Sequence, residues 1–229
     1  MAQIKGTALP TVSSAGELAA LVGDVGFLPA FRNRIHGFSA EECVAPAYWF
    51  SGEGEGFWEW KGPVIRRSGC AYGKLLGGRA AFVAPEWYAE LANVRRDGYD
   101  FDARWDDGLA RREDKQVYDA LCAHGSLLSK QLHRTAAPGE KRAAFDGVMT
   151  RLQMLGYVVV ADFEYETDRR GQTYGWGVAR YETPEHRFGA AFTDAVYAHA
   201  PQESRDILLG RLGRLLPETP RGELLRLIG

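Results

Sequence analysis

The chain has 229 residues, of which 45% are hydrophobic and 12% aromatic, a composition typical of a folded globular protein and not of a disordered one. Its formal net charge of −2 provides no general attraction for nucleic acid, so such a function would have to depend on local basic patches. No apolar run approaches the roughly 18–20 residues that span a bilayer, and the N-terminus lacks a signal-peptide pattern. The cysteines Cys43, Cys70 and Cys122 have neither zinc-site nor disulfide spacing. We therefore expect a cytoplasmic protein with no membrane segment, metal or cofactor.

Residues 1–110 are predicted to form a mixed helical and irregular region that is rich in aromatic side chains. Ser13 or Ser14, followed by Glu17, predicts a helix that begins with a capping box. The segment "FSAEEC" predicts a second, short helix, and Pro85 is expected in the first turn of another. Between these, "YWFSGEGEGFWEWKGPVIRR" alternates glycines with aromatic residues, which indicates irregular or short-strand structure around a core.

Residues 111–185 show a clearer order of elements. A helix that ends at Gly125 is followed by a short extended segment, a second helix, and a third helix that ends at Gly156. The runs "YVVVADFEYE" and "TYGWGVARY" alternate as strands around the turn at residues 167–172. This order is that of a winged helix-turn-helix with the turn as its wing. The predicted fold class is α+β: a winged helix-turn-helix core with additional N-terminal and C-terminal helical segments, the latter at residues 186–229. No internal repeat is evident.

Basic residues on the second helix, the third helix and the wing are candidates for DNA contacts. Lys and Arg neutralise phosphates, and the first turns of a recognition helix meet base edges in the major groove. The predicted nucleic-acid-binding residues are Lys130, Arg134, Lys141, Arg142, Arg151, Arg169 and Arg170, with Gln172 beside them. The acidic neighbours Glu140, Asp146 and Asp168 leave a plain solvated face as the alternative explanation.

An aromatic cluster in the N-terminal region is a second candidate feature. It consists of Tyr48, Trp49, Phe50, Phe57, Trp58 and Trp60. Such rings can stack on an extruded base. Large aromatic side chains more often fill a core, and this is the interpretation that we favour.

A group of carboxylates follows, at Asp97, Asp100, Asp102, Asp106 and Asp107. The spacing does not match an EF-hand loop, so we expect helix caps, turns or salt bridges to Arg95, Arg96 and Arg104 and no metal site. No motif pairs a nucleophile with a base, and no catalytic residue is assigned.

Three segments together resemble a known family. They are "GRAAFVAPEWYAELANVRR", "DKQVYDALCAHGSLLSKQL" and "EKRAAFDGVMTRLQMLGYVVVADFEYETDRRGQTYGWGVARY". They resemble winged-helix proteins of the AlkZ type, bacterial DNA glycosylases associated with unhooking interstrand crosslinks, and in particular the shorter AlkZ-related proteins. The resemblance covers roughly residues 45–185 and includes the patterns "HGxLxxxxL" and "KRAxxxxxxRLQMLGYV". It implies a winged-helix fold, DNA as a partner and a link to DNA repair.

Two alternatives to simple DNA binding remain open. The catalytic Gln-apolar-Gln or Gln-apolar-Asp motif of the glycosylases is absent from this sequence. A glycosylase-like enzyme would therefore need a non-standard acid–base group, such as Glu59 or a carboxylate between Asp97 and Asp107. The other alternative is a non-catalytic dimerisation or partner-binding module. A homodimer would then form through the apolar stripe of the C-terminal helices, although packing within the chain explains the same stripe: Ile207, Leu208, Leu212, Leu215 and Leu216.

Overall fold

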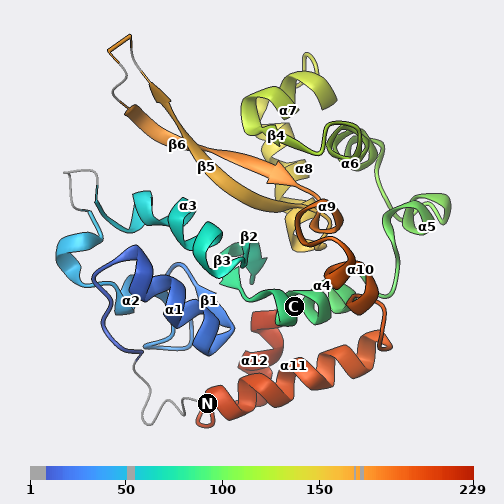
Figure 1. Cartoon of the computed structure of the whole chain (residues 1–229). Coiled ribbons are helices and arrows are strands. Elements are labelled where there is room, and N and C mark those ends of the chain that lie inside the picture. The colour runs from blue at the N-terminus through green and yellow to red at the C-terminus, as the bar shows by residue number, and fades with distance from the viewer. Residues whose placement is uncertain (1–8, 51–54, 168, 171–172) are drawn as a thin grey trace.

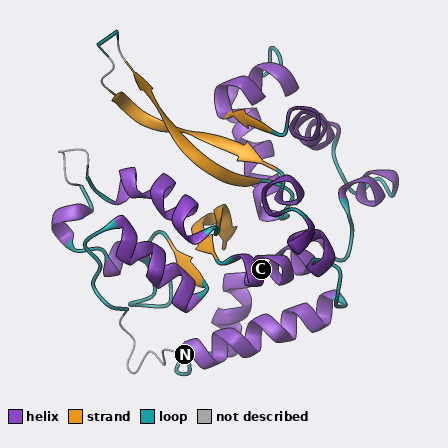
Figure 2. Cartoon of the chain, in the orientation of Figure 1, coloured by secondary structure: helices purple, strands orange, loops and turns teal. Residues whose placement is uncertain are grey.

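The computed structural model describes residues 9–50, 55–167, 169–170 and 173–229. The chain is a mixed α+β protein, as predicted, and its helices surround one antiparallel sheet (Figures 1 and 2). The sheet has six strands in the order β1-β3-β2-β5-β6-β4. Strands from residues 1–110 and from residues 111–185 therefore belong to the same sheet.

The elements of the first part of the chain end with a tight β-hairpin. Glu17 confirms the predicted capping box, because its amide donates to the Ser14 hydroxyl at 3.1 Å and its carboxylate accepts from the Ser13 amide at 2.7 Å. The elements are α1 (Ala15–Val25), β1 (Phe27–Pro29), α2 (Ala40–Cys43), the 3-10 turn η1 (Pro46–Tyr48), α3 (Phe57–Ser68), β2 (Ala71–Leu76) and β3 (Arg79–Val83).

Helix α3 is a departure from the sequence prediction, which had irregular or short-strand structure here. The helix runs through Pro63, a residue that usually breaks helices. Phe57, Trp60 and Val64 recur at helical spacing and are buried on one face. Burial of this face stabilises the helix enough to offset the lost hydrogen bond at the proline.

The remaining elements follow the predicted order through residue 185. They are α4 (Pro85–Arg96), α5 (Phe101–Asp106), α6 (Arg112–His124), β4 (Ser126–Leu128), α7 (Ser129–Ala136), α8 (Arg142–Met154), β5 (Val159–Thr167) and β6 (Thr173–Glu182). The C-terminal segment forms α9 (Pro184–Phe188), α10 (Ala190–Ala195), α11 (Pro201–Leu215) and α12 (Arg221–Ile228). Strands β5 and β6 make a long ribbon that projects from the body (Figure 2).

The two halves of the sheet repeat one order of elements. The series α1-β1-α2-α3-β2-β3, which we call unit 1, is followed by α6-β4-α7-α8-β5-β6, which we call unit 2. In each unit the short first strand pairs with the last strand of the hairpin. Gly26 and Gly125 precede the two short strands, and Pro85 and Pro184 begin the helix after each hairpin. The separation in sequence is the same for both pairs.

The two units meet with approximate two-fold symmetry. Tyr72 pairs with Val160, and the two residues hold equivalent places, because Tyr72 faces Phe82 and Val160 faces Tyr181 in their own hairpins. Helix α3 packs against β5, while its counterpart α8 packs against β2. The expectation of no internal repeat is therefore wrong at the level of topology. The repeat lies in the order and pairing of elements, which a comparison of residue identities does not detect.

Two hydrophobic cores support this arrangement. The larger one joins unit 1 and α4 to the C-terminal helices, and the smaller one lies among α5–α8. The apolar stripe of α11 and the residue after it contributes Leu208, Leu212, Leu215 and Leu216 to the larger core, whereas Ile207 is 36% exposed. Packing within the chain accounts for most of the stripe, and a homodimer through these helices stays a prediction.

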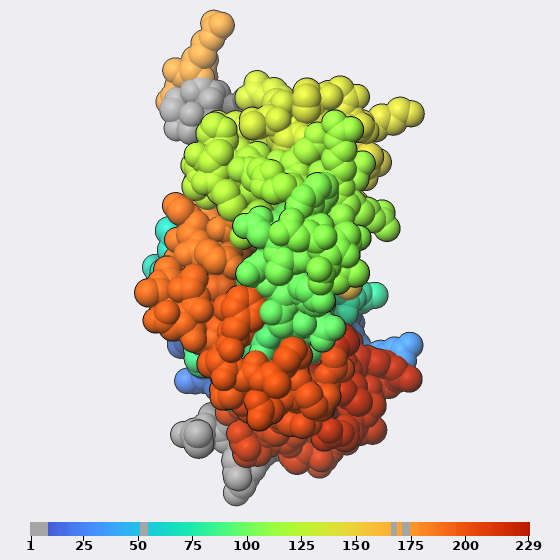
Figure 3. Space-filling view, turned by 90° about the vertical axis from the view of Figure 1, so that its right-hand side faces the viewer, coloured from blue at the N-terminus to red at the C-terminus, as the bar shows by residue number. Residues whose placement is uncertain are grey.

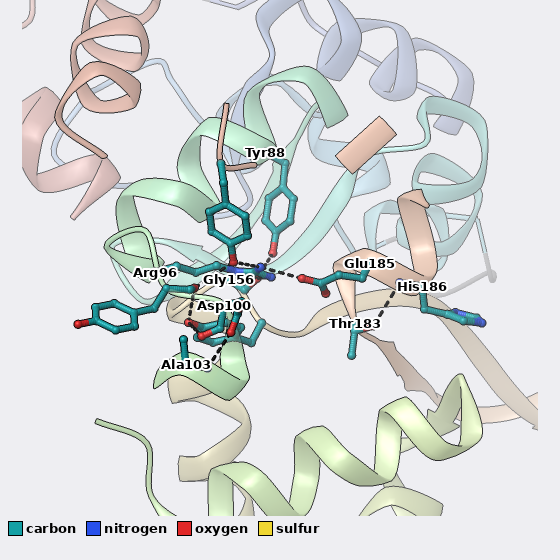
Figure 4. Close-up of polar contacts among 11 residues, drawn as sticks. Tyr88, Arg96, Asp100, Ala103, Gly156, Thr183, Glu185 and His186 are labelled. Carbon is teal, nitrogen blue, oxygen red and sulfur yellow. Dashed lines mark hydrogen bonds and ion pairs between the residues drawn. The ribbon is translucent and has the colours of Figure 1, made fainter. Parts of the chain in front are cut away.

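Arg96, at the end of α4, is fully buried between elements of unit 2 and the C-terminal segment (Figure 4). Its guanidinium donates to the Gly156 carbonyl at 2.8 Å, pairs with Glu185 at 2.7 Å and donates to the Tyr197 hydroxyl at 2.9 Å. It also lies over the Tyr157 ring, 4.4 Å from the centroid. Burial by itself lowers the pKa of Arg96, but the charge of Glu185 and the hydrogen bonds raise it above the ordinary value, so the group stays charged.

The adjacent Arg95 connects three segments that are distant in sequence. Its guanidinium donates to the carbonyls of Leu75 and Met154, both at 3.0 Å, and to the carbonyl of Ile228. Burial lowers the pKa of Arg95 to about 10. The end of α4 thus holds β2 of unit 1, α8 of unit 2 and α12 together.

Replacement of Arg96 is expected to destabilise the whole chain. In Arg96→Met, the Gly156 carbonyl and the Glu185 carboxylate lose their shared cationic donor. Breaking a buried ion pair from one side typically costs about 3–5 kcal/mol. Urea unfolding followed by circular dichroism measures the change, with Arg112→Met on the exposed surface of α6 as the matched control. Equal unfolding midpoints for the two variants would contradict the role of Arg96.

A second prediction concerns Gly156, whose backbone φ is +79°. A Cβ atom there would lie 3.1 Å from the Ala92 Cα, so Gly156→Ala adds a backbone clash to the conformational cost. Gly139→Ala is the control, since its φ is +86° and no atom lies within 4 Å of the added Cβ. Both variants are expected to lose about 1–2 kcal/mol from the left-handed conformation, and only Gly156→Ala to lose clearly more. A loss for Gly156→Ala in thermal unfolding that is no larger than that for Gly139→Ala would contradict a clash with the α4 backbone.

Candidate nucleic-acid interface

Helix α7 lies at the same end of the molecule as the far end of the β5–β6 ribbon (Figures 1 and 3). Lys130 and Arg134 are exposed on α7, and Lys141 is exposed immediately before α8. The Arg142 side chain is 49% exposed at the first residue of α8. The structure therefore brings four of the seven predicted contact residues to one region.

Arg142 connects the two helices of this region. Its guanidinium donates to the Ser129 hydroxyl at 2.6 Å and pairs with Asp146 one turn further along α8 at 2.9 Å. An exposed pair of this kind contributes little to stability, about 0–1 kcal/mol. Its clearer consequence is geometric, because it fixes the start of α8 against the start of α7.

The N-terminal half of α8 has an exposed side with mostly short side chains. Phe145, Val148 and Met149 turn into the smaller core. On the other side, Ala143, Ala144, Asp146 and Gly147 are exposed and carry only small or short side chains. A large, flat partner could therefore approach the helix backbone closely here, with Lys141 at the edge of the contact.

Arg151 has a structural partner at the opposite end of α8. Its guanidinium pairs with Asp114 of α6 through two parallel bonds of 2.6 and 3.0 Å, and the Asp114 side chain is 4% exposed. Bidentate pairs of this type fix orientation as well as distance. Arg151 therefore holds α8 to α6, and its groove contact stays a prediction.

The turn of the ribbon carries the remaining predicted contacts. Arg169 and Arg170 are exposed there, while Asp168 and Gln172 lie outside the described residues. Further down the ribbon, Arg180 pairs with Glu164 at 2.6 Å.

Two aromatic rings, one on β6 and one before α3, are exposed on either side of Trp58. Trp176 of β6 is 72% exposed and Phe50 is 71% exposed. Both contact Trp58 of α3, at centroid distances of 5.8 and 6.1 Å. The core interpretation is confirmed for Phe57 and Trp60, which are buried, and is wrong for Phe50. Trp176 was not among the predicted residues, although its place between two glycines in "YGWG" leaves it without side chains beside it in sequence.

Lys61 of α3 lies over two other aromatic rings, those of Phe163 and Trp58. Its Nζ is 4.3 Å from the centroid of Phe163 and 4.8 Å from that of Trp58. Burial lowers the pKa of Lys61 to about 8, against a smaller opposing effect of the Glu59 charge. A fraction of this amine is therefore neutral near physiological pH.

The carboxylates considered for acid–base chemistry have local structural partners. Glu59 accepts from the Gly56 amide at 3.1 Å and so caps α3. Asp100 caps α5 by accepting from the Ala103 amide at 2.7 Å, and Asp107 accepts from the Tyr99 hydroxyl at 3.0 Å. The expected caps are thus present, whereas the buried Arg96 pairs with Glu185 and not with the Asp97–Asp107 group.

Within the described ranges, no three His, Cys, Asp or Glu side chains gather in a way that could hold a metal ion. Among the described helices, none is long and apolar enough to span a bilayer.

The fold and this site define an α+β protein with a duplicated helix–strand unit and an exposed basic region. The chain belongs to the AlkZ-related family, whose model matches residues 12–229. This confirms the resemblance and extends it on both sides of the segments that carried it. Comparisons with curated proteins and with solved structures gave no match.

The lowered pKa of Lys61 predicts that its replacement changes the stability of the chain in a pH-dependent way. Because its folded pKa is lowered to about 8 from 10.5, the unfolded chain binds more protons between these values. Below pH 8 the burial of charged Lys61 therefore lowers the stability of the chain by its full amount, and this loss disappears as the pH rises to about 10.5. Lys61→Met is expected to be more stable than the wild type at pH 7 by about 1–3 kcal/mol, and the gain should shrink by pH 10. A pH-independent difference between the two urea midpoints would contradict the lowered pKa.

Proposed function

We propose that the protein binds double-stranded DNA through unit 2, which acts as a winged helix-turn-helix. The observation that carries the proposal is the pairing of β4 with β6, which places α7 and α8 beside the β5–β6 ribbon in the winged-helix order. In this assignment α8 is the recognition helix and the ribbon is the wing.

The surface of α8 supports this assignment. Ala143, Ala144 and Gly147 leave the helix backbone accessible to the wall of a groove. Lys141 at the start of the helix and Arg134 on α7 provide positive charge for the phosphates on either side. Arg169 and Arg170 would add contacts from the wing.

Membership of the AlkZ-related family supports a place in DNA repair, since the family is related to DNA glycosylases. Catalysis has weaker support than binding, because Glu59 and Asp100 are used as helix caps. We accordingly propose a DNA-binding protein linked to repair, with shape and backbone contacts as the main source of affinity.

Salt dependence tests the proposed contacts. In Lys141→Ala/Arg169→Ala/Arg170→Ala, three phosphate contacts are lost, and each contact contributes about 0.9 to the slope of log affinity against log salt. The slope should fall by roughly 2–3, and affinity at low salt should fall at least tenfold. Fluorescence anisotropy with a labelled duplex measures both quantities.

The matched control removes the same charge from the C-terminal helices, at Arg205→Ala/Arg214→Ala/Arg221→Ala. It should bind the duplex as the wild type does. No duplex binding by the wild type at low salt, or equal losses in the two variants, would overturn the proposal.

A further inference from the structure

A cavity of about 550 Å³ lies where α12 covers the turn between β2 and β3. This volume is within the range of small-molecule sites in proteins. Apolar side chains form part of its wall, among them Phe31, Ile35, Leu76 and Leu227. Four arginines and one carboxylate also line it: Arg32, Arg34, Arg79, Arg226 and Glu223.

Comparison of the two units shows that an insertion builds this cavity. In unit 2, β4 leads directly into α7, whereas residues 30–39 separate β1 from α2 in unit 1. The insertion supplies Phe31, Arg32 and Arg34 to the wall. Helix α12 contributes to this cavity on unit 1, whereas α11 and α12 lie at the other end of the molecule from α7 of unit 2 (Figure 1).

Hydrogen bonds fix the shape of the inserted loop. The Asn33 side chain donates to the Phe38 carbonyl at 2.9 Å and accepts from the Ile35 amide at 2.8 Å. Arg79 donates to the Arg32 carbonyl at 3.0 Å and so ties the loop to the hairpin of unit 1. These contacts hold the backbone that carries Arg32 and Arg34 against the sheet, as a preformed site requires.

The charges around the cavity do not cancel. Glu223 is shared between Arg226 and Arg34, the latter at 3.7 Å, and Glu41 lies 3.9 Å from Arg32. Four arginines therefore line the cavity together with one lining carboxylate, Glu223, and Glu41 lies outside the wall beside Arg32. Arg79 donates to the Arg32 carbonyl, and among the described residues no carboxylate forms an ion pair with it.

We propose that this cavity binds a small organic anion with a ring-like apolar body and a phosphate group, of the size of a nucleoside monophosphate. Arg79 and Arg226 hold the phosphate, because the guanidinium fork matches phosphate oxygens in pairs. The apolar wall formed by Phe31, Leu76 and Leu227 receives the ring. The site does not depend on DNA binding by unit 2.

Glu223 sets the affinity of the site. Its carboxylate accepts a hydrogen bond from Arg226, lies 3.7 Å from the Arg34 guanidinium, and repels an incoming phosphate. Binding therefore exchanges one anionic partner of these arginines for another. Removal of the Glu223 charge leaves both guanidinium groups available to the ligand.

Isothermal titration calorimetry with adenosine monophosphate, adenosine and inorganic phosphate tests the site on the full chain. Adenosine monophosphate should bind at least tenfold more tightly than adenosine. Arg79→Gln/Arg226→Gln should weaken binding at least tenfold, whereas Glu223→Gln should strengthen it severalfold. The control Arg205→Gln/Arg214→Gln on α11 should bind as the wild type does, and thermal unfolding confirms that each variant is folded.

Three results would overturn the proposal. They are no heat from adenosine monophosphate at millimolar concentration, equal binding of adenosine, and unchanged affinity in folded Arg79→Gln/Arg226→Gln. Weaker binding in Glu223→Gln would overturn the competition assigned to that residue. Duplex binding by each variant is measured separately, so a failure of this site and a failure of DNA binding by unit 2 are distinguishable.

Discussion

The buried guanidinium of Arg96 constrains the rest of the structure most strongly. A fully buried charge costs several kcal/mol unless it is paired and its hydrogen bonds are satisfied. Its partners come from the end of α8, from α9 and from the segment after α10, so these segments can adopt only relative positions that complete its coordination. The pairing is therefore as much a constraint on geometry as a source of stability.

The segment "RLQMLGY" (residues 151–157), part of a pattern that carries the family resemblance, forms this junction. Arg151 pairs with Asp114, and the Met154 and Gly156 carbonyls accept from Arg95 and Arg96. The side chain of Gln153 accepts from the Lys74 amide at 3.1 Å, beside the Tyr72–Val160 pair where the units meet. The residues of this segment thus connect unit 1, unit 2 and α4, which is a structural explanation for the pattern.

The order of elements in unit 2 could be predicted because local signals agree with the fold. Glycines end α6 and α8 as expected, and the apolar spacing of α8 matches the face that it buries. Helix α3 could not be predicted in this way, since Pro63 and the flanking glycines oppose the helix and only tertiary burial of Phe57 and Trp60 decides it. The partner of Arg96 is equally non-local, because Glu185 is far away in sequence.

The candidate interface was predictable in part. The exposure of Lys141, Arg142, Arg169 and Arg170 followed from the element order, because a helix start and a hairpin turn are exposed by construction. The sequence did not distinguish Arg151, which has the same charge but faces the nearly buried Asp114. Exposure of Phe50 and Trp176 was also hidden, since a sequence gives the identity of an aromatic residue but not whether another ring covers it.

The two units share one order of elements but have different surroundings. In unit 1, α12 and the loop at residues 30–39 enclose the hairpin turn, while the longer ribbon of unit 2 extends away from the body. The near-neutral net charge of the chain is compatible with local basic regions, because the charges are unevenly distributed. Arginines lie around the enclosed hairpin turn of unit 1 and at the exposed turn of unit 2. Carboxylates such as Asp114 and Glu185 instead pair with buried or half-buried arginines. The overall charge therefore says little about what either end of the molecule binds.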